Sequence, residues 1–197
     1  MTNRLMTIFT QHKVLRGYNF AALPHSSTFE PLRIIDNILY DVKHYDRKVW
    51  LLFQDMSKAY DRVNIFMLQK AMARLKLPSP FITFITNLFT NRTNQIFTYH
   101  GTTNPYNVLV GIDQGEVICP LLWCIYYDPL LCHIQNQPDL GYRLSHSWST
   151  TATGPTDQSL SATIPDTAFI DDTTWITSSQ SNMESILSIA DSFFYPQ

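Results

Sequence analysis

The sequence predicts an α+β fold, in which helices pack on one face of an antiparallel sheet. Several segments carry apolar residues at helical spacing, and short runs of β-branched and aromatic residues lie between them. Two such runs flank Asp171 and Asp172, which indicates a hairpin with two carboxylates near its tip. A chain of 197 residues with 45% hydrophobic and 15% charged residues has the composition of a folded globular protein.

The first predicted elements are a helix over residues 28–45 and a strand over residues 49–54. Ser27 and Glu30 have the spacing of a capping box, and apolar residues then recur at the spacing of a helix with one buried face. The strand segment is apolar throughout, as in a strand that is covered on both faces. It ends directly before Asp55.

Two adjacent amphipathic helices are predicted next. The first covers residues 65–77 and ends at Pro78. The second begins with Ser79 as the N-cap and Pro80 at the first helical position. We expect its buried side to consist of bulky apolar residues, namely Phe81, Phe84, Ile85, Leu88 and Phe89.

Strands and a long helix follow. Residues 95–100 and 106–110 predict two strands, joined by a loop rich in Gly, Thr, Asn and Pro. Residues 116–135 predict a buried helix that Pro129 should kink or end, because proline lacks the amide donor of a regular helix.

The last third of the chain contains an unusual polar segment. Residues 145–167 hold 11 Ser or Thr among 23 positions, so we expect a mobile surface loop there. The predicted hairpin follows over residues 169–177, and apolar spacing predicts a final helix over residues 182–194. The order of elements places the first carboxylate and the hairpin carboxylates at strand ends.

Charge is distributed unevenly along the chain. Residues 1–76 hold 12 of the 14 Lys and Arg but 6 of the 16 Asp and Glu, whereas residues 77–197 carry a net charge of -8. A basic first part favours contact with a polyanion, and an acidic remainder suits metal binding; a chance imbalance between solvated faces is the alternative. Cys119, Cys124 and Cys132 form no CxxC pair, and we expect buried free thiols.

The sequence predicts an intracellular protein, nuclear or cytoplasmic and not secreted. No apolar signal-peptide core follows Met1. The longest apolar stretch, residues 120–131, is interrupted by Asp128 and is too short to span a bilayer. We therefore expect no membrane association.

The acidic residues gain meaning only in combination. With 13 aspartates in the chain, about one adjacent Asp pair is expected by chance, and Asp also favours hairpin turns. Asp55 alone could be a strand-end or helix-cap residue. A carboxylate at a strand end that faces a carboxylate pair at a hairpin tip, however, is an arrangement that holds divalent cations for displacement at phosphorus.

Three motifs stand in order along the chain. They are FQDMSKAYD at residues 53–61, QGEVICPLL at residues 114–122 and FIDD at residues 169–172. In this order they resemble the palm motifs of reverse transcriptases, in particular those of non-LTR (LINE-type) retrotransposons. Residues 17–20 and 26–28 loosely resemble the finger segment of these enzymes, and the resemblance extends over roughly residues 11–194.

The resemblance implies that residues 1–197 are a reverse transcriptase domain fragment with a polymerase palm, part of the fingers and no thumb. The implied parts are partial fingers (1–48), palm with the first Asp motif (49–76), a connection between fingers and palm (77–110), and palm with the Gln-Gly and Asp-Asp motifs (111–197), including the loop at 145–167. Expected activity then depends on thumb and endonuclease regions of a longer polypeptide.

The resemblance also implies the roles of the motif carboxylates. Asp55, Asp171 and Asp172 are the implied catalytic and metal-binding residues, with Asp172 the more peripheral. They are expected to hold two Mg²⁺ ions, or Mn²⁺ instead, because the ligands are hard oxygens and no His or Cys stands in the motifs. The backbone carbonyl of Gln54 or Met56 is expected to complete a coordination sphere.

A nucleotide pocket is implied by further motif residues. They are Ala59, Tyr60, Gln114, Gly115 and Phe169, with Lys58 and Asp61 as weaker candidates. Tyr60 stands where the family places a steric gate against a 2′-hydroxyl; a packed core aromatic is the alternative. Lys58 and Asp61 could also form a surface ion pair on a helix.

The predicted function is that of a reverse transcriptase fragment, an RNA-directed DNA polymerase with an RNA template, a DNA primer and dNTPs as partners. One alternative is a catalytically silent remnant that folds or binds RNA. A further alternative is a group II intron-type maturase or an RNA-dependent RNA polymerase, and Tyr60 argues against the RNA polymerase.

Overall fold

A computed structural model describes residues 1–149 and 157–194, which group into two units. The sheet unit comprises residues 16–21, 25–55 and 130–197, and the helical unit comprises residues 1–15, 22–24 and 56–129. Within the described residues, no helix is both long and apolar enough to cross a membrane.

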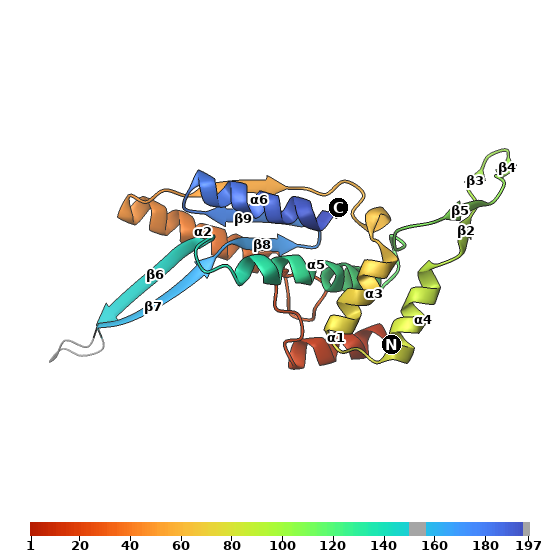
Figure 1. Cartoon of the computed structure of the whole chain (residues 1–197), viewed down its shortest axis with the longest axis horizontal. Coiled ribbons are helices and arrows are strands. Elements are labelled where there is room, and N and C mark those ends of the chain that lie inside the picture. The colour runs from red at the N-terminus through yellow and green to blue at the C-terminus, as the bar shows by residue number, and fades with distance from the viewer. Residues whose placement is uncertain (150–156, 195–197) are drawn as a thin grey trace. The chain divides into compact units, whose positions relative to one another are not determined.

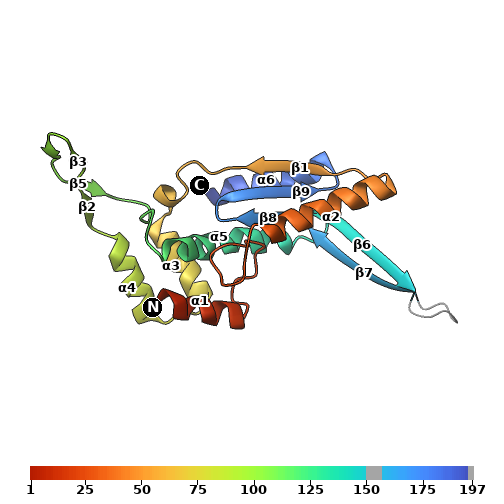
Figure 2. The same ribbon diagram turned by 180° about the vertical axis from the view of Figure 1, so that it is seen from behind.

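The sheet unit is built on three antiparallel strands in the order β1-β9-β8. These strands are β1 (Trp50–Gln54), β8 (Asp166–Phe169) and β9 (Asp172–Thr177). They lie side by side in Figure 1, and Figure 2 shows them from behind. The α+β class with an antiparallel sheet is therefore confirmed, and the hairpin predicted around the Asp pair is formed by β8 and β9.

Strand β1 lies at the edge of the sheet, which corrects the prediction of a strand covered on both faces. It pairs with β9 alone, from Trp50 opposite Thr177 to Gln54 opposite Thr173. Trp50 is 44% exposed and Phe53 is 71% exposed. A continuous apolar run fits both a central and an edge strand, so composition alone could not decide between them.

Helix α2 (Phe29–Tyr45) supplies the main core of the sheet unit. Ile38 on α2 is fully buried and clusters with Tyr142, Ile164 and Ile176. The expected capping interaction precedes the helix, because the Glu30 carboxylate accepts bonds from the Ser27 amide (2.9 Å) and hydroxyl (2.7 Å). The last helix, α6 (Gln180–Phe194), follows β9 and buries Met183, Ile186 and Ala190.

A buried acid ties α2 to the rest of the sheet unit. Asp41 is only 4% exposed and accepts hydrogen bonds from the Tyr142 hydroxyl and from Arg47, whose Nη1 lies 3.1 Å from Oδ2. Burial, together with the Asp41 carboxylate, raises the pKa of Tyr142 to about 12. Arg47 also donates to the Arg143 carbonyl (3.3 Å), so part of the basic excess of the first 76 residues serves folding.

The Ser/Thr-rich segment contains two paired strands, which corrects the prediction of an irregular loop. Strands β6 (Tyr142–Ser149) and β7 (Asp157–Ile164) form an antiparallel ladder from Tyr142 opposite Ile164 to Ser149 opposite Asp157. Backbone pairing satisfies the polar main chain without requiring a large apolar face, so a polar composition did not exclude strands. Residues 150–156 of the predicted loop lie outside the described residues.

The helical unit begins with a helix that the sequence analysis did not predict. Its helices include α1 (Thr2–Gln11), the 3₁₀ helix η1 (Tyr60–Arg62), α3 (Ile65–Arg74) and α4 (Ser79–Phe89). It also contains two pairs of short strands. Strand β2 (Arg92–Asn94) pairs with β5 (Tyr106–Val108), and β3 (Phe97–Thr98) pairs with β4 (Gly101–Thr102). The predicted strands at 95–100 and 106–110 are thus replaced by two shorter pairs, whose outer pair begins at Arg92.

The start and the buried side of α4 differ from the prediction. Pro78 rather than Ser79 is the N-cap, without a side-chain capping bond. Ile82, Ile85 and Phe89 are buried, whereas Phe84 is 47% and Leu88 46% exposed. The buried residues follow a single stripe at helical spacing, whereas the prediction had counted every bulky residue as core.

Helix α5 (Cys119–Gln135) continues past Pro129, so the helix does not end at this proline. Proline removes one helical hydrogen bond, but most residues of α5 are buried, and packing offsets that loss. Asp128 forms an ion pair with Arg74 of α3, within the helical unit.

The prediction of buried free thiols is confirmed for Cys119 and Cys124, and burial raises the pKa of the Cys124 thiol to about 12.

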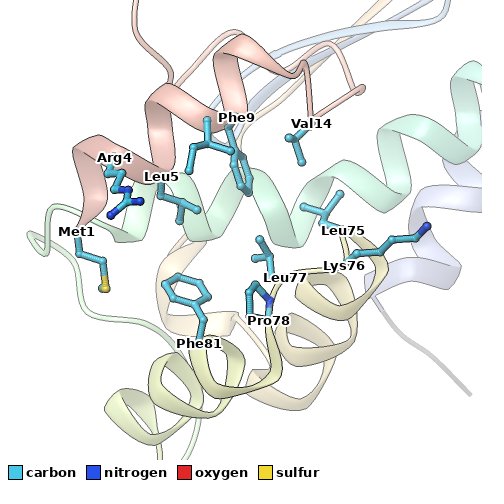
Figure 3. A pocket seen from close by; sticks show the side chains of 11 residues that line it. Met1, Arg4, Leu5, Phe9, Val14, Leu75, Lys76, Leu77, Pro78 and Phe81 are labelled. Carbon is cyan, nitrogen blue, oxygen red and sulfur yellow. The ribbon is translucent and has the colours of Figure 1, made fainter.

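An apolar pocket of about 790 Å³ lies in the helical unit, between α1 and the start of α4 (Figure 3). Leu5 and Phe9 of α1 and Phe81 of α4 are among its lining side chains. None of the residues predicted to form the site lines this pocket.

Candidate functional site

The three predicted catalytic carboxylates lie at one end of the sheet unit. Asp55 directly follows β1, Asp172 is the first residue of β9, and Asp171 lies in the turn between β8 and β9. Because Gln54 pairs with Thr173, the end of β1 is adjacent to the start of β9. Asp55 and Asp172 are exposed and Asp171 is half-buried, so solvent reaches this end of the sheet.

The electrostatics of Asp171 show that the carboxylates interact. Burial raises the pKa of Asp171, and the negative charges of Asp172 and Asp55 raise it further. A cation placed between them would relieve this repulsion. Among the described residues, no three His, Cys, Asp or Glu side chains come close enough together to hold a metal ion by themselves. Any ion here would therefore take further oxygen ligands, for which backbone carbonyls, water and phosphates are suitable.

A buried tryptophan fixes the strand that leads to Asp55. The indole Nε1 of Trp175 donates a 2.7 Å hydrogen bond to Oε1 of Gln54, the last residue of β1. Trp175 is fully buried in β9, so the end of β1 is attached to the centre of the sheet. The sequence predicted a role only for the backbone carbonyl of Gln54, as a metal ligand, and not for its side chain as a hydrogen-bond acceptor.

The turn that carries Asp171 has an unusual backbone. Ile170 has a φ of +58°, in the left-handed region that a β-branched residue rarely adopts. Such a conformation costs about 1–2 kcal/mol. Asn19 bonds both backbone groups of Ile170, because its Nδ2 donates to the Ile170 carbonyl (2.9 Å) and its Oδ1 accepts from the Ile170 amide (3.1 Å). Sequence reasoning noted Asn19 only within the loose finger similarity. Phe169, predicted to line a nucleotide pocket, is the last residue of β8 and pairs with Asp172.

The other predicted pocket residues belong to the helical unit. Ala59 is 4% exposed, and the Tyr60 ring lies 6.1 Å from the ring of Trp123, at a tilt of 52°. Tyr60 is half-buried, and its ring lies near that of Trp123. Among the described ion pairs, none joins Lys58 to Asp61.

The loop before Gln114 and Gly115 is attached to the segment that follows Tyr60. The Gly111 amide donates to the Val63 carbonyl and the Ile112 amide to the Tyr60 carbonyl, both at 2.9 Å. Arg92 holds the same loop, since its Nη2 donates to the Gly111 carbonyl (2.6 Å) and it pairs with Asp113. Within the helical unit, the first and second motifs are therefore adjacent. Gln114 and Gly115 themselves are exposed.

Replacing Gly111 with alanine should destabilise this junction strongly. A Cβ at Gly111 would lie 2.8 Å from the Asp61 carbonyl oxygen, and its φ is +91°. We expect Gly111→Ala to lower the free energy of unfolding by about 3 kcal/mol, from overlap and backbone strain together. Gly101→Ala is the matched control: its φ is +116° but nothing lies within 4 Å of its Cβ, so about 1 kcal/mol is expected. Equal losses in urea denaturation would contradict the close approach.

Sequence comparisons identify the family of the chain. The sequence model of the family described as "Reverse transcriptase (RNA-dependent DNA polymerase)" matches residues 3–195. The probable RNA-directed DNA polymerase from transposon X-element of Drosophila melanogaster is 29% identical over 140 residues, which are 70% of this chain and 14% of that protein. The corresponding protein from transposon BS of the same species is 28% identical over 135 residues, 67% of this chain and 14% of that protein. The chain thus spans about a seventh of the length of these relatives.

Solved structures with a similar fold include telomerases. Telomerase from Candida tropicalis, in complex with a TWJ fragment of telomeric RNA, matches with a TM-score of 0.63 and 13% identity over 95% of this chain and 30% of that chain. Apo telomerase from the same species, truncated from its C-terminal domain, has a TM-score of 0.60 and 14% identity over 98% of this chain and 38% of that one. At this identity the likeness concerns the fold alone. The family match over nearly the whole sequence establishes that the chain belongs to the reverse transcriptase (RNA-dependent DNA polymerase) family, as a relative of the polymerases of non-LTR retrotransposons.

Proposed function

We propose that this chain is the palm-centred part of an RNA-directed DNA polymerase, which transfers nucleotides from dNTPs to a primer 3′-hydroxyl. The observation that carries the proposal is the gathering of Asp55, Asp171 and Asp172 at one end of the β1-β9-β8 sheet. The chain also belongs to a family of RNA-dependent DNA polymerases, which supports a role for these carboxylates in nucleotide transfer. A silent remnant would not need their shared position at one end of the sheet.

The carboxylates suit divalent cations. Reverse transcriptases generally use such ions, and the oxygen-only donors here favour two Mg²⁺ ions, or Mn²⁺ in their place. Asp55 and Asp171 would hold both ions, and Asp172 would lie more peripherally. When bound, the ions supply charge neutralisation at the triphosphate and lower the pKa of the primer hydroxyl. The chain's own part is positioning: β1 and the β8–β9 turn present the carboxylates from two fixed strand ends.

The proposed partners are an RNA template, a DNA primer and dNTPs. The RNA bound to the telomerase of similar fold supports an RNA partner. In the helical unit, Tyr60 and Ala59, together with the exposed Gln114 and Gly115, are the proposed nucleotide-contacting residues, and Phe169 in the sheet unit is another. The half-buried Tyr60 is the proposed barrier to a 2′-hydroxyl.

Substituting Tyr60 tests the proposed preference for deoxynucleotides. In the polypeptide that carries this sequence, Tyr60→Val should raise rNTP relative to dNTP incorporation by about 10–100-fold, because the ring no longer opposes the 2′-hydroxyl. Single-nucleotide primer extension on an RNA template measures the ratio of the two kcat/KM values. Tyr106→Val, an exposed aromatic on β5, is the control and should leave that ratio unchanged. If Tyr60→Val lowers both rates equally, Tyr60 only packs against Trp123, and the proposal that it selects dNTPs over rNTPs is wrong.

A further inference from the structure

The turn that carries Asp171 is held from outside the hairpin. Phe169 pairs with Asp172, so Ile170 and Asp171 alone form the tip. The left-handed φ of Ile170 (+58°) determines where the following residue points. A β-branched side chain disfavours this conformation, so an isolated hairpin with this sequence would seldom adopt it.

The segment 18–21 runs beside β8 and reaches the tip. The Ala168 amide donates to the Tyr18 carbonyl (2.8 Å), and the Phe20 amide donates to the Ala168 carbonyl (2.9 Å), which makes a parallel bridge between Asn19 and Ala168. This bridge places the Asn19 side chain at the turn. Its amide group pairs with both the N–H and the C=O of Ile170.

The same side chain is fixed at its own base. Oδ1 of Asn19 also accepts from the Ala21 amide (3.2 Å), so the carboxamide is oriented before it meets the turn. A carboxamide supplies a donor and an acceptor in one plane, as the two backbone groups of Ile170 require. Alanine would remove both of these bonds to the turn.

We propose that Asn19 is a positioning residue, which keeps Ile170 left-handed and thereby orients the Asp171 carboxylate toward Asp55 and its metal ions. This role rests on the proposed function of Asp171. Metal ligands tolerate misplacement of only about 0.5 Å, so a relaxed turn would weaken ion binding and slow the reaction without removing any ligand.

A double-mutant cycle with Ile170 tests this role. Asn19→Ala should lower kcat for primer extension by about 10–100-fold, with little change in KM for dNTP, and should raise the Mg²⁺ concentration needed. Glycine adopts a positive φ without steric cost, so in the Ile170→Gly background the further loss caused by Asn19→Ala should fall to about threefold or less. Equal losses in both backgrounds would overturn the proposed mechanism.

Two measurements do not depend on turnover. Hydrogen exchange of the Ile170 amide should accelerate about tenfold or more in Asn19→Ala, because its acceptor is lost. Mn²⁺ affinity, measured by electron paramagnetic resonance, should weaken by about tenfold. Unchanged Mn²⁺ affinity and unchanged exchange would also overturn the proposal.

The matched control is Asn182→Ala. Asn182 Nδ2 donates to the Asp139 carbonyl (2.7 Å) within the same unit, so this variant removes a comparable carboxamide-to-backbone bond away from the turn. It should leave kcat and Mn²⁺ affinity unchanged. If Asp171→Asn is inactive while Asn19→Ala is fully active, only the positioning role fails; if Asp171→Asn stays active, the proposed function itself fails.

Discussion

Asp171→Asn should reduce primer extension by at least about 10³-fold, because it removes one of two carboxylates expected to hold both metal ions. The same change should leave the fold intact or slightly stabilise it. Burial and the neighbouring charges of Asp172 and Asp55 raise the pKa of Asp171, so its ionised form is disfavoured in the folded state. Neutral Asn removes that repulsion at nearly constant volume. The expected signature is an inactive protein with an unchanged or higher Tm.

Companion variants separate a metal ligand from a general charge effect. Asp55→Asn should match the loss of Asp171→Asn, and Asp172→Asn should lose less, because Asp172 is the more peripheral carboxylate. Asp191→Asn, at an exposed position of α6 in the same unit, is the control and should keep full activity. Both RNA-templated dNTP incorporation and thermal unfolding are measured. Persistent dNTP incorporation by Asp171→Asn would remove the basis for its catalytic role.

The gathering of the carboxylates could be predicted from sequence because it depends on local signals. The apolar run before Asp55 indicated a strand that ends at a carboxylate, and the flanks of Asp171 and Asp172 indicated a hairpin. Antiparallel pairing of these strands then brings the end of one to the start of the other. Which strand lies at the edge is a property of the whole sheet, and this was wrong for β1.

The support of the turn could not be predicted, because its contacts are distant in sequence. Asn19 lies 151 residues before Ile170, and no periodicity connects them. The strain at Ile170 is equally hidden, since an Ile-Asp pair at a hairpin tip contradicts the usual preference for Gly or Asn at positive φ. The prediction of a loop over residues 145–167 was wrong because it relied on composition alone. The composition is typical of a loop, but the backbone of this segment contributes to the paired strands β6 and β7.

Asp166 should make the protein less stable as the pH rises from about 4 to about 7. This residue begins β8 and has no exposed surface. Oδ1 accepts from Gln135 Nε2 (2.9 Å), and Oδ2 has no hydrogen-bond partner among the described residues. Burial raises the pKa of Asp166 from 3.8 to about 7, although the Gln135 bond opposes the shift.

The sign follows from proton binding. Between these two pKa values the folded state keeps the Asp166 proton and the unfolded state does not, so raising the pH favours unfolding until the pH exceeds about 7. The full penalty is about 4 kcal/mol, of which a neutral Asn would recover most. Asp166→Asn should therefore raise the free energy of unfolding at pH 8, by up to that amount, and change it little at pH 4.

This prediction is tested by urea denaturation of the parent chain, Asp166→Asn and Asp139→Asn, which gives the free energy of unfolding of each between about pH 4 and pH 8. Asp139 precedes β6 and serves as the control, and its replacement should leave the pH dependence of the parent chain in place. The two carboxyls differ in their surroundings, since only Asp166 is buried without a compensating cation. If the Asp166→Asn variant is less stable than the parent chain at pH 8, the ionised Asp166 carboxylate has a favourable partner and the predicted penalty is absent.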